Sequence, residues 1–398
     1  MIARHDGQVV LVAGAIPGER VRARVERTSR SVAYAETTAL DEASPDRRAW
    51  AGDPACGGCL YAHIAYSRQL QIKAAVVADA FAHIGRITLP TDVAVEPSPE
   101  EGYRMRARLH VRGLRLGLFR EGTHDLCDAR QTKQFLAATC DVLDRVGAAI
   151  RSLGVDSVRE IDLAENADAS ARAIAIETTA PIAATILEQI GSAGALTGVV
   201  CGRRTVGDPH VVDTITVEGG PSIGLRRHVL AFFQGNRFLL PRLVSHVLGE
   251  IPEHAEVVDL YAGGGLFSIA AARARGARVT AVEGDFVAAA DLAANAAGAS
   301  GVTAVHESVE TFLSRGVGPL ARDAVALVDP PRTGMSKEAA DGLVRLGASR
   351  IVYVSCDVAT LARDARRLVD AGYRVATTRA FDLFPNTPHV ETVVTFTR

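Results

Sequence analysis

The chain has few cysteines, few aromatic residues and no long apolar run. Its 398 residues include six cysteines and one tryptophan, and aromatic side chains make up 5%. Six cysteines are too few for a disulfide scaffold, so we expect reduced thiols. No segment approaches the ~18 uninterrupted apolar residues of a membrane helix, and the start MIARHDGQ lacks the pattern of a secretory signal. We therefore expect a cytoplasmic protein without a membrane partner.

A strong charge bias is also absent. The formal net charge is −2, with 48% hydrophobic and 23% charged residues, which is ordinary globular composition. This balance excludes a largely disordered chain and argues against a uniformly basic nucleic-acid binder. The length suggests two or three domains.

Three parts follow one another along the chain. Residues 1–45 carry short alternating segments with Gly and Pro turns, which are typical of a small β domain. Residues 46–230 predict a central α+β domain. Residues 231–398 alternate strand and helix, with helices expected at 266–275, 286–297, 336–347 and 359–371. This alternation predicts an α/β fold with a doubly wound, mostly parallel sheet. The last two strands, 373–381 and 390–397, leave no room for a crossover helix, so we expect them to pair as an antiparallel edge.

One segment of the central part is strongly basic. In YRMRARLHVRG (103–113) apolar residues alternate with Arg104, Arg106, Arg108, His110 and Arg112. Because side chains alternate across a strand, one face would be buried and the other basic. No acidic residue occurs from Tyr103 to Arg120, so we expect the basic face to bind a polyanion rather than remain a solvated sheet face.

A glycine turn between a strand and a helix predicts a nucleotide-like cofactor. DLYAGGGLFSIAAA (259–272) includes Gly263 and Gly265, and the next strand ends in Glu283, which could accept hydrogen bonds from both hydroxyls of a ribose. A dinucleotide site has similar features. The G-G-G spacing, followed directly by an apolar helix, favours an adenosyl ligand without phosphates, such as S-adenosylmethionine.

Three further strand ends carry reactive side chains. LVDPPRTGMS (327–336) places Asp329 and Arg332 in a stiff proline loop at the edge where doubly wound sheets bind ligands. Cys356 lies between a buried strand and a helix, a position that favours a reactive thiolate over an inert buried thiol. Glu391 begins the final strand, where a buried carboxylate with a raised pKa could act as a general base.

Together these motifs resemble the RNA 5-methyluridine methyltransferases, the tRNA and 23S rRNA (uracil-5-)-methyltransferases. The matching segments are VVDLYAGGGLFS, AVALVDPPRTG, YVSCDVATLARD, LFPNTPHVETVV and FFQGNRFL. The match is most specific over 231–398, and the N-terminal strands are similar to a TRAM domain whose first strand is missing. The resemblance implies a Rossmann-like catalytic domain, S-adenosylmethionine as cofactor and RNA as partner.

The resemblance also assigns roles to matching residues. Cys356 would be the nucleophile and Glu391 the base that removes the C5 proton of uridine. Residues expected to bind S-adenosylmethionine or to line the joint pocket are Gln234, Tyr261, Gly263, Gly265, Glu283 and Asp329. Residues expected to contact RNA are Arg104, Arg106, Arg108 and Arg332. We expect a monomer that acts on 23S rRNA, with tRNA as the alternative.

One departure concerns a metal cluster. Many family members hold a four-iron cluster with four cysteines, but here Trp50 and Thr132 occupy two of the four positions. Only Cys56 and Cys59 remain, and two thiolates do not hold such a cluster. We therefore expect neither a 4Fe–4S cluster nor another metal site.

Two other functions remain open on these residues. The first is a methyltransferase that acts on another base or a small molecule without covalent catalysis. The second is a non-catalytic RNA-binding protein that retains the fold. Cys356 together with Glu391 argues against both, because direct transfer to nitrogen or oxygen needs neither group and a binding protein needs no nucleophile.

Overall fold

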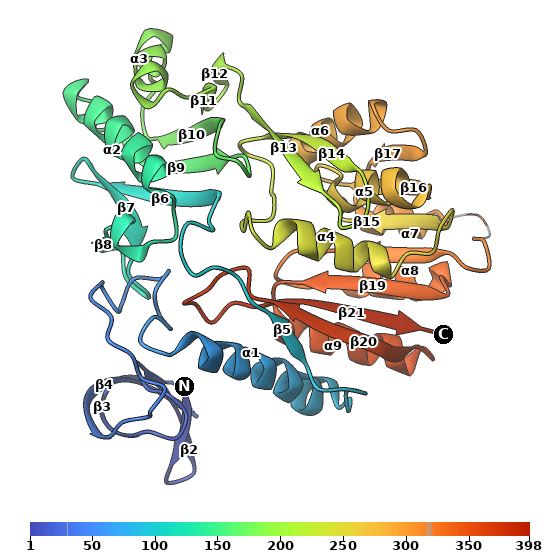
Figure 1. The fold of residues 1–398 in the computed structure, drawn as a ribbon, viewed down its shortest axis with the longest axis horizontal. Coiled ribbons are helices and arrows are strands. Elements are labelled where there is room, and N and C mark those ends of the chain that lie inside the picture. Colours follow the sequence, from blue (N-terminus) through green and yellow to red (C-terminus); the bar gives the residue numbers. More distant parts are fainter. Residues whose placement is uncertain (30, 317, 319) are drawn as a thin grey trace.

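The computed structural model describes residues 1–398 except residues 30, 317 and 319 (Figure 1). The N-terminal part forms a four-stranded sheet in the order β1-β2-β4-β3, in which β2 and β4 run parallel. Its strands are β1 (Ile2–His5), β2 (Gln8–Ala13), β3 (Arg20–Ser29) and β4 (Val32–Glu42). The short alternating segments of residues 1–45 therefore do form a separate β sheet.

The central sheet has seven strands in the order β12-β11-β10-β9-β6-β7-β8. They are β6 (Arg106–Arg112), β7 (Arg115–Phe119), β8 (Leu126–Cys127), β9 (Val158–Glu165), β10 (Arg172–Thr178), β11 (Gly198–Cys201) and β12 (Arg204–Gly207). Helices α2 (Ala137–Ser152) and α3 (Ala184–Gly194) pack on one face and bury apolar side chains such as Val146 and Leu187 against it. A short 3₁₀ turn, Arg130–Thr132, leads into α2.

A separate hairpin joins the central sheet to the C-terminal part. Strands β13 (His210–Thr216) and β14 (Ser222–His228) pair antiparallel. Val211 packs against Ala164 and Ala173 of the central sheet, while Ile215 and Leu225 belong to the core of the C-terminal part. The hairpin therefore buries apolar surface against both neighbours.

The C-terminal sheet confirms the predicted doubly wound fold. Its strand order is β17-β16-β15-β18-β19-β21-β20-β5. The strands are β15 (Glu256–Leu260), β16 (Arg278–Glu283), β17 (Val302–His306), β18 (Val325–Val328), β19 (Arg350–Ser355), β20 (Arg374–Phe381) and β21 (Glu391–Thr397). The first five run parallel, and β21 lies antiparallel between β19 and β20.

The predicted edge of this sheet is wrong in one respect. A short strand from the central range, β5 (Ala94–Glu96), pairs parallel with β20 and becomes the edge instead. Arg242 and Arg379 form ion pairs with Glu96 and so stabilise β5 at this edge. Three residues are too few to show an alternating pattern, so this strand could not be predicted from its residues.

Helices cover both faces of the C-terminal sheet. They are α4 (Leu240–Gly249), α5 (Leu266–Arg275), α6 (Phe286–Ala297), α7 (Val309–Ser314), α8 (Lys337–Leu346) and α9 (Val358–Asp370). The helices expected at 266–275 and 286–297 agree with α5 and α6. None of the helices in the described ranges is long and apolar enough to cross a membrane.

Helix α1 (Tyr66–Ala80) continues into a short π-helix at Phe81–Gly85. Although α1 lies far upstream in the sequence, it packs against the C-terminal part (Figure 1). Lys73 is buried and pairs with the buried carboxylate of Asp382. The buried Gln69 donates to the side chain of Asn386 and accepts from its backbone N–H. These contacts fix the loop that leads from β20 to Glu391.

The expectation of six reduced thiols is wrong at two positions. Cys56 and Cys127 form a disulfide, with Cα atoms 5.7 Å apart and a sequence separation of 71. The β7–β8 pairing brings Cys127 beside the segment around Cys56, which also forms a β-bridge with Arg120. A contact across this separation depends on the tertiary fold, so spacing alone could not show it.

The buried Lys73–Asp382 pair gives a test of how α1 is held. We expect Lys73→Met to destabilise the protein by about 3–5 kcal/mol, because the Asp382 carboxylate is left buried without its partner. The double variant Lys73→Met/Asp382→Leu should recover much of this loss. The midpoint of urea unfolding measures both.

Lys133→Met is the matched control, because it breaks an exposed pair with Glu101. Its cost should stay within about 1 kcal/mol. A double variant as unstable as Lys73→Met alone would contradict the assignment.

Candidate functional site

The carboxyl ends of the parallel strands and the start of β21 meet at one edge of the C-terminal sheet. The β19–β21 ladder ends with Ser355 opposite Thr392. Continued by one residue, this register places Cys356 directly opposite Glu391. Asp329 follows β18, the neighbour of β19, and its backbone N–H donates to the last residue of β15, at 3.3 Å. The structure therefore brings together four predicted strand ends.

The glycine turn after β15 has the backbone that its sequence predicts. Tyr261, Gly263 and Gly265 have φ of 65°, 57° and 93°, in the left-handed region. A Cβ on Gly263 would meet no heavy atom within 4 Å, so its outer side is open to a ligand. A Cβ on Gly265 would lie 2.9 Å from Leu292 of α6, so this glycine serves close packing. The turn can thus approach a ligand at Gly263 while α5 stays packed.

Glu283 is positioned by the backbone of the same turn. Its two carboxylate oxygens accept from the N–H groups of Gly263 and Asp285, each at 2.7 Å. Each oxygen keeps a further lone pair. A diol such as a ribose could therefore donate to both oxygens, which fits the adenosyl ligand predicted from the sequence.

Asp329 and Gln234 lie together. The Gln234 side chain is buried and is close enough to Asp329 to influence its pKa. Burial, followed by the charges of Glu391 and Asp259, raises the pKa of Asp329 well above its usual value, and Gln234 opposes this rise. This shift favours the protonated carboxyl, which can donate as well as accept a hydrogen bond.

The pKa of the Cys356 thiol differs from the sequence expectation of a reactive thiolate. Burial, with the charge of Glu391, raises the pKa of its thiol to about 11. The position before α9 had suggested a lowered pKa. Burial outweighs the helix end here, and Asp357 itself caps α9 by accepting from Ala359 and Thr360. Cys356 is therefore a thiol in the ligand-free protein at neutral pH.

Arg332 carries the positive charge that acts on Cys356 and Glu391. Its positive charge opposes the rise in the Cys356 pKa. Its charge also opposes the effect of burial, which raises the pKa of Glu391. Arg332 itself is exposed, and its backbone oxygen accepts from Thr360 of α9 at 3.2 Å. The sequence assigned Arg332 to RNA, while the structure places its charge beside the two reactive groups.

The basic strand differs from its prediction. Arg108 forms ion pairs with Asp162 and Glu160 of the neighbouring strand β9, and His110 contacts Glu160. The inference that this face lacks acidic partners is therefore wrong, since the partners come from a strand about 50 residues away in sequence. Arg104 donates to Gln134 inside the protein.

Arg106 has a different neighbour. Its guanidinium lies 5.6 Å from the ring centre of Phe232, a side chain that is 61% exposed. Among Arg104, Arg106 and Arg108, Arg106 is therefore the one whose guanidinium lies beside an exposed aromatic ring.

Sequence reasoning missed Asp259, the buried acid of the motif that carries the glycine turn. Ser268 of α5 donates to one of its oxygens, and burial raises the pKa of Asp259 to about 7. An isolated acid inside an apolar strand, EVVDL, was the available signal. The hydrogen bond between Ser268 and Asp259 links α5 to β15, and the charge of Asp259 raises the pKa of Asp329.

The residues at the expected cluster positions do not fit a four-iron cluster. Cys56 is bonded to Cys127, Cys59 is a buried free thiol, and Thr132 donates its hydroxyl to a backbone oxygen. Burial raises the pKa of Cys59 to about 12, which disfavours the thiolate that a metal needs.

Comparisons with known proteins agree with this arrangement. A family model described as tRNA (Uracil-5-)-methyltransferase matches residues 320–398, and a TRAM domain model matches residues 1–38. An uncharacterized RNA methyltransferase of Thermotoga maritima is 31% identical, with 99% of this chain and 94% of that protein covered. The 23S rRNA (uracil(1939)-C(5))-methyltransferase RlmD of Alkalilimnicola ehrlichii is 32% identical, with 100% and 93% covered.

A solved structure shares the whole fold. The tRNA (uracil-54, C5)-methyltransferase of Pyrococcus abyssi, in complex with S-adenosyl-L-homocysteine, has a TM-score of 0.77 at 24% identity and covers 97% of this chain and 94% of its own. The predicted family is confirmed by relatives above 30% identity that match nearly the entire length. The chain belongs to the family of S-adenosylmethionine-dependent RNA (uracil-5-)-methyltransferases.

Proposed function

We propose that this chain methylates C5 of a uridine in RNA through a transient covalent bond between Cys356 and C6 of the ring. The observation that carries the proposal is the register of β19 and β21, which, continued by one residue, sets Cys356 opposite Glu391. The charges of Asp329 and Arg332 interact with those of Cys356 and Glu391. Direct transfer to nitrogen or oxygen would need no such pair.

The chemistry of uracil explains why the pair is needed. C5 of uracil is a poor nucleophile towards a sulfonium methyl group. The Cys356 thiol first loses its proton to water, and the resulting sulfur anion bonds to C6. The electrons of the C5–C6 double bond then make C5 an enolate carbon. The O4 side of this enolate gains negative charge, which a hydrogen-bond donor such as a protonated Asp329 carboxyl would stabilise.

S-Adenosylmethionine, when bound beside Gly263 and Glu283, supplies the methyl group and leaves as S-adenosylhomocysteine. The methylated ring then carries one proton too many at C5. Glu391 takes this proton, the C5–C6 double bond re-forms, and the Cys356 sulfur leaves with the electrons of its bond. Arg332 stabilises the sulfur anion at the start and at the end of the cycle.

RNA must present a single base to this site. A base inside a duplex cannot reach side chains at the end of a sheet, so the target uridine leaves its stack. The exposed ring of Phe232, with Arg106 beside it, lies in the segment that also carries Gln234. An aromatic ring with a guanidinium neighbour suits an unpaired nucleotide.

We propose 23S rRNA as the substrate, because full-length relatives with that name share 30–32% identity. The tRNA alternative rests on a structural neighbour at 24% identity, which carries the fold alone. Incubating wild-type protein with a 23S rRNA transcript and with tRNA transcripts, then measuring 5-methyluridine, separates the two. The cytoplasmic location and the monomeric state stay predictions.

Glu391→Gln tests the base. The variant should form the Cys356 bond and transfer the methyl group but fail to release the product, so a protein–RNA adduct should accumulate on denaturing gels. Single-turnover reactions with labelled S-adenosylmethionine measure it. Absence of any adduct, with cofactor binding intact, would remove Glu391 from its role.

Cys356→Ala tests the nucleophile. We expect loss of methyl transfer by a factor of at least about 10³, because a covalent route cannot begin without the sulfur. Binding of S-adenosylmethionine should be unchanged, as measured by calorimetry. Cys201→Ala, which removes a buried thiol of the central sheet, is the matched control and should stay active. Turnover in Cys356→Ala would exclude the covalent mechanism.

Alkylation by iodoacetamide tests the charge of Arg332. Because the thiol pKa is about 11, modification of Cys356 should accelerate about tenfold for each pH unit between about pH 7 and 10. Arg332→Gln removes the cation that lowers this pKa, so alkylation at about pH 8 should slow about threefold or more. Arg332→Lys should retain most of the rate. Equal rates in wild type and Arg332→Gln would contradict the assignment.

A further inference from the structure

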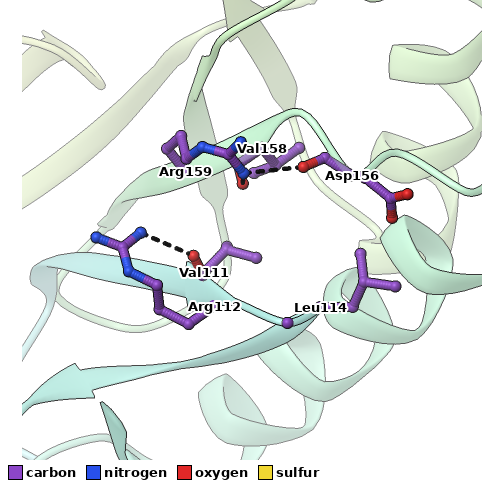
Figure 2. Close-up of a pocket in the computed structure, with 7 residues that line it drawn as sticks. Val111, Arg112, Leu114, Asp156, Val158 and Arg159 are labelled. Carbon is purple, nitrogen blue, oxygen red and sulfur yellow. Dashed lines mark hydrogen bonds between the residues drawn. The ribbon is translucent and has the colours of Figure 1, made fainter. Parts of the chain in front are cut away.

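Strands β6 and β9 separate at the end that lies away from the catalytic sheet. Their ladder stops at His110 opposite Glu160, although β6 continues to Arg112 and β9 begins at Val158. The space between the diverging strands is a surface cavity of about 580 Å³ (Figure 2). Val111, Leu114 and Val158 supply its apolar wall.

Two guanidinium groups stand at this cavity. Arg112 donates to the backbone oxygen of Val111 at 3.0 Å, and Arg159 donates to those of Asp156 and Val158 at 2.9 and 3.3 Å (Figure 2). These bonds use one nitrogen of each group. A guanidinium has five N–H donors in a planar fork, so most donors of both side chains have no partner among the described residues.

Neither Arg112 nor Arg159 has an ion-pair partner in the part of the chain that the structure describes. Within the described ranges, no carboxylate lies within 4.0 Å of the charged nitrogens of Arg112 or Arg159, whereas Arg108 on the same strand has two such partners. Asp156 also lines the cavity, with its carboxylate extending away from Arg159 in Figure 2. Arg151 adds a third cation, since it donates to the backbone oxygen of Leu114.

Aromatic surface adjoins the cations. The Arg112 guanidinium lies 5.4 Å from the ring centre of Phe119, and that ring stacks on His110 at 3.5 Å with an interplanar angle of 5°. Cations that alternate with flat rings are typical of surfaces that bind single-stranded nucleic acid. A small inorganic anion would use the cations but not the rings.

We propose that this cavity, held by Arg112 and Arg159, anchors the phosphodiester backbone of the RNA substrate at a second site, apart from the catalytic edge. The inference rests on RNA being the substrate. Forked guanidinium donors match phosphate oxygens, and the apolar wall suits a ribose. Strand β6 runs from Arg106, beside the exposed Phe232, to Arg112, so one RNA strand could follow it from the target base to the anchor.

The salt dependence of RNA binding tests the anchor. The wild type and the double variant Arg112→Gln/Arg159→Gln are titrated with a fluorescent oligouridylate over a range of salt concentrations. The slope of log K against log salt should fall by about 0.7 for each phosphate of a single strand that the variant no longer neutralises. The control is Arg203→Gln, which removes an exposed arginine of the β11–β12 turn on the same sheet and should leave the slope unchanged.

Each outcome bears on either the anchor or the catalytic proposal. An unchanged slope in the double variant, with S-adenosylmethionine affinity intact, would overturn the anchor while C5 methylation by the wild type could still stand. A reduced slope, with no competition by inorganic phosphate at equal ionic strength, would assign the cavity to RNA. Competition by inorganic phosphate would instead assign it to a small anion and overturn the proposal. A wild type that makes no 5-methyluridine would refute the catalytic proposal alone.

Discussion

The antiparallel pairing of β21 with β19 is the constraint on which the site depends. In a purely parallel sheet every strand would present its carboxyl end to the same edge. Here one strand is reversed, so the amino end of β21 lies beside the carboxyl end of β19. Continued by one residue, the register sets Glu391 opposite Cys356, although α9 and β20 separate the two in the chain. A shift of the register by one residue would turn the carboxyl to the other face of the sheet.

Contacts from helix α1 stabilise the loop that sets the register of β21. The buried pair of Lys73 and Asp382, with the Gln69–Asn386 contacts, holds the loop that precedes Glu391. Lys73 and Gln69 come from α1, far upstream in the chain. The proton states follow from the same enclosure, because burial raises the pKa values of Cys356, Asp329 and Glu391 together. Arg332 is the charge that opposes this effect at Cys356 and Glu391.

Local patterns in the sequence sufficed where the interaction is local. The helices at 266–275 and 286–297, the left-handed glycines of the turn and the reversed last strand all follow from residues that are close in the chain. Cys356, Glu391, Asp329 and Glu283 were named from the sequence because each lies at the end of a recognisable strand, and their roles stay predictions. Fold class and family were predicted from the same motifs.

What the sequence did not reveal depends on contacts between distant segments. Asp162 and Glu160 neutralise Arg108 only because β9 pairs with β6, and Cys127 meets Cys56 only through the β7–β8 pairing. The pKa of Cys356 was misjudged for a similar reason, since the helix end is local and the enclosure is not. Strand β5 was too short to have a pattern of its own.

The most direct test of the covalent mechanism uses RNA in which uridine is replaced by 5-fluorouridine. After methyl transfer, Glu391 would have no proton to remove from C5, so the bond between Cys356 and C6 should persist. Intact-mass measurement should then find the protein joined to methylated RNA, with the crosslink on the peptide that contains Cys356. Normal methylation of uridine-containing RNA, combined with no crosslink or a crosslink on another residue, would contradict the account.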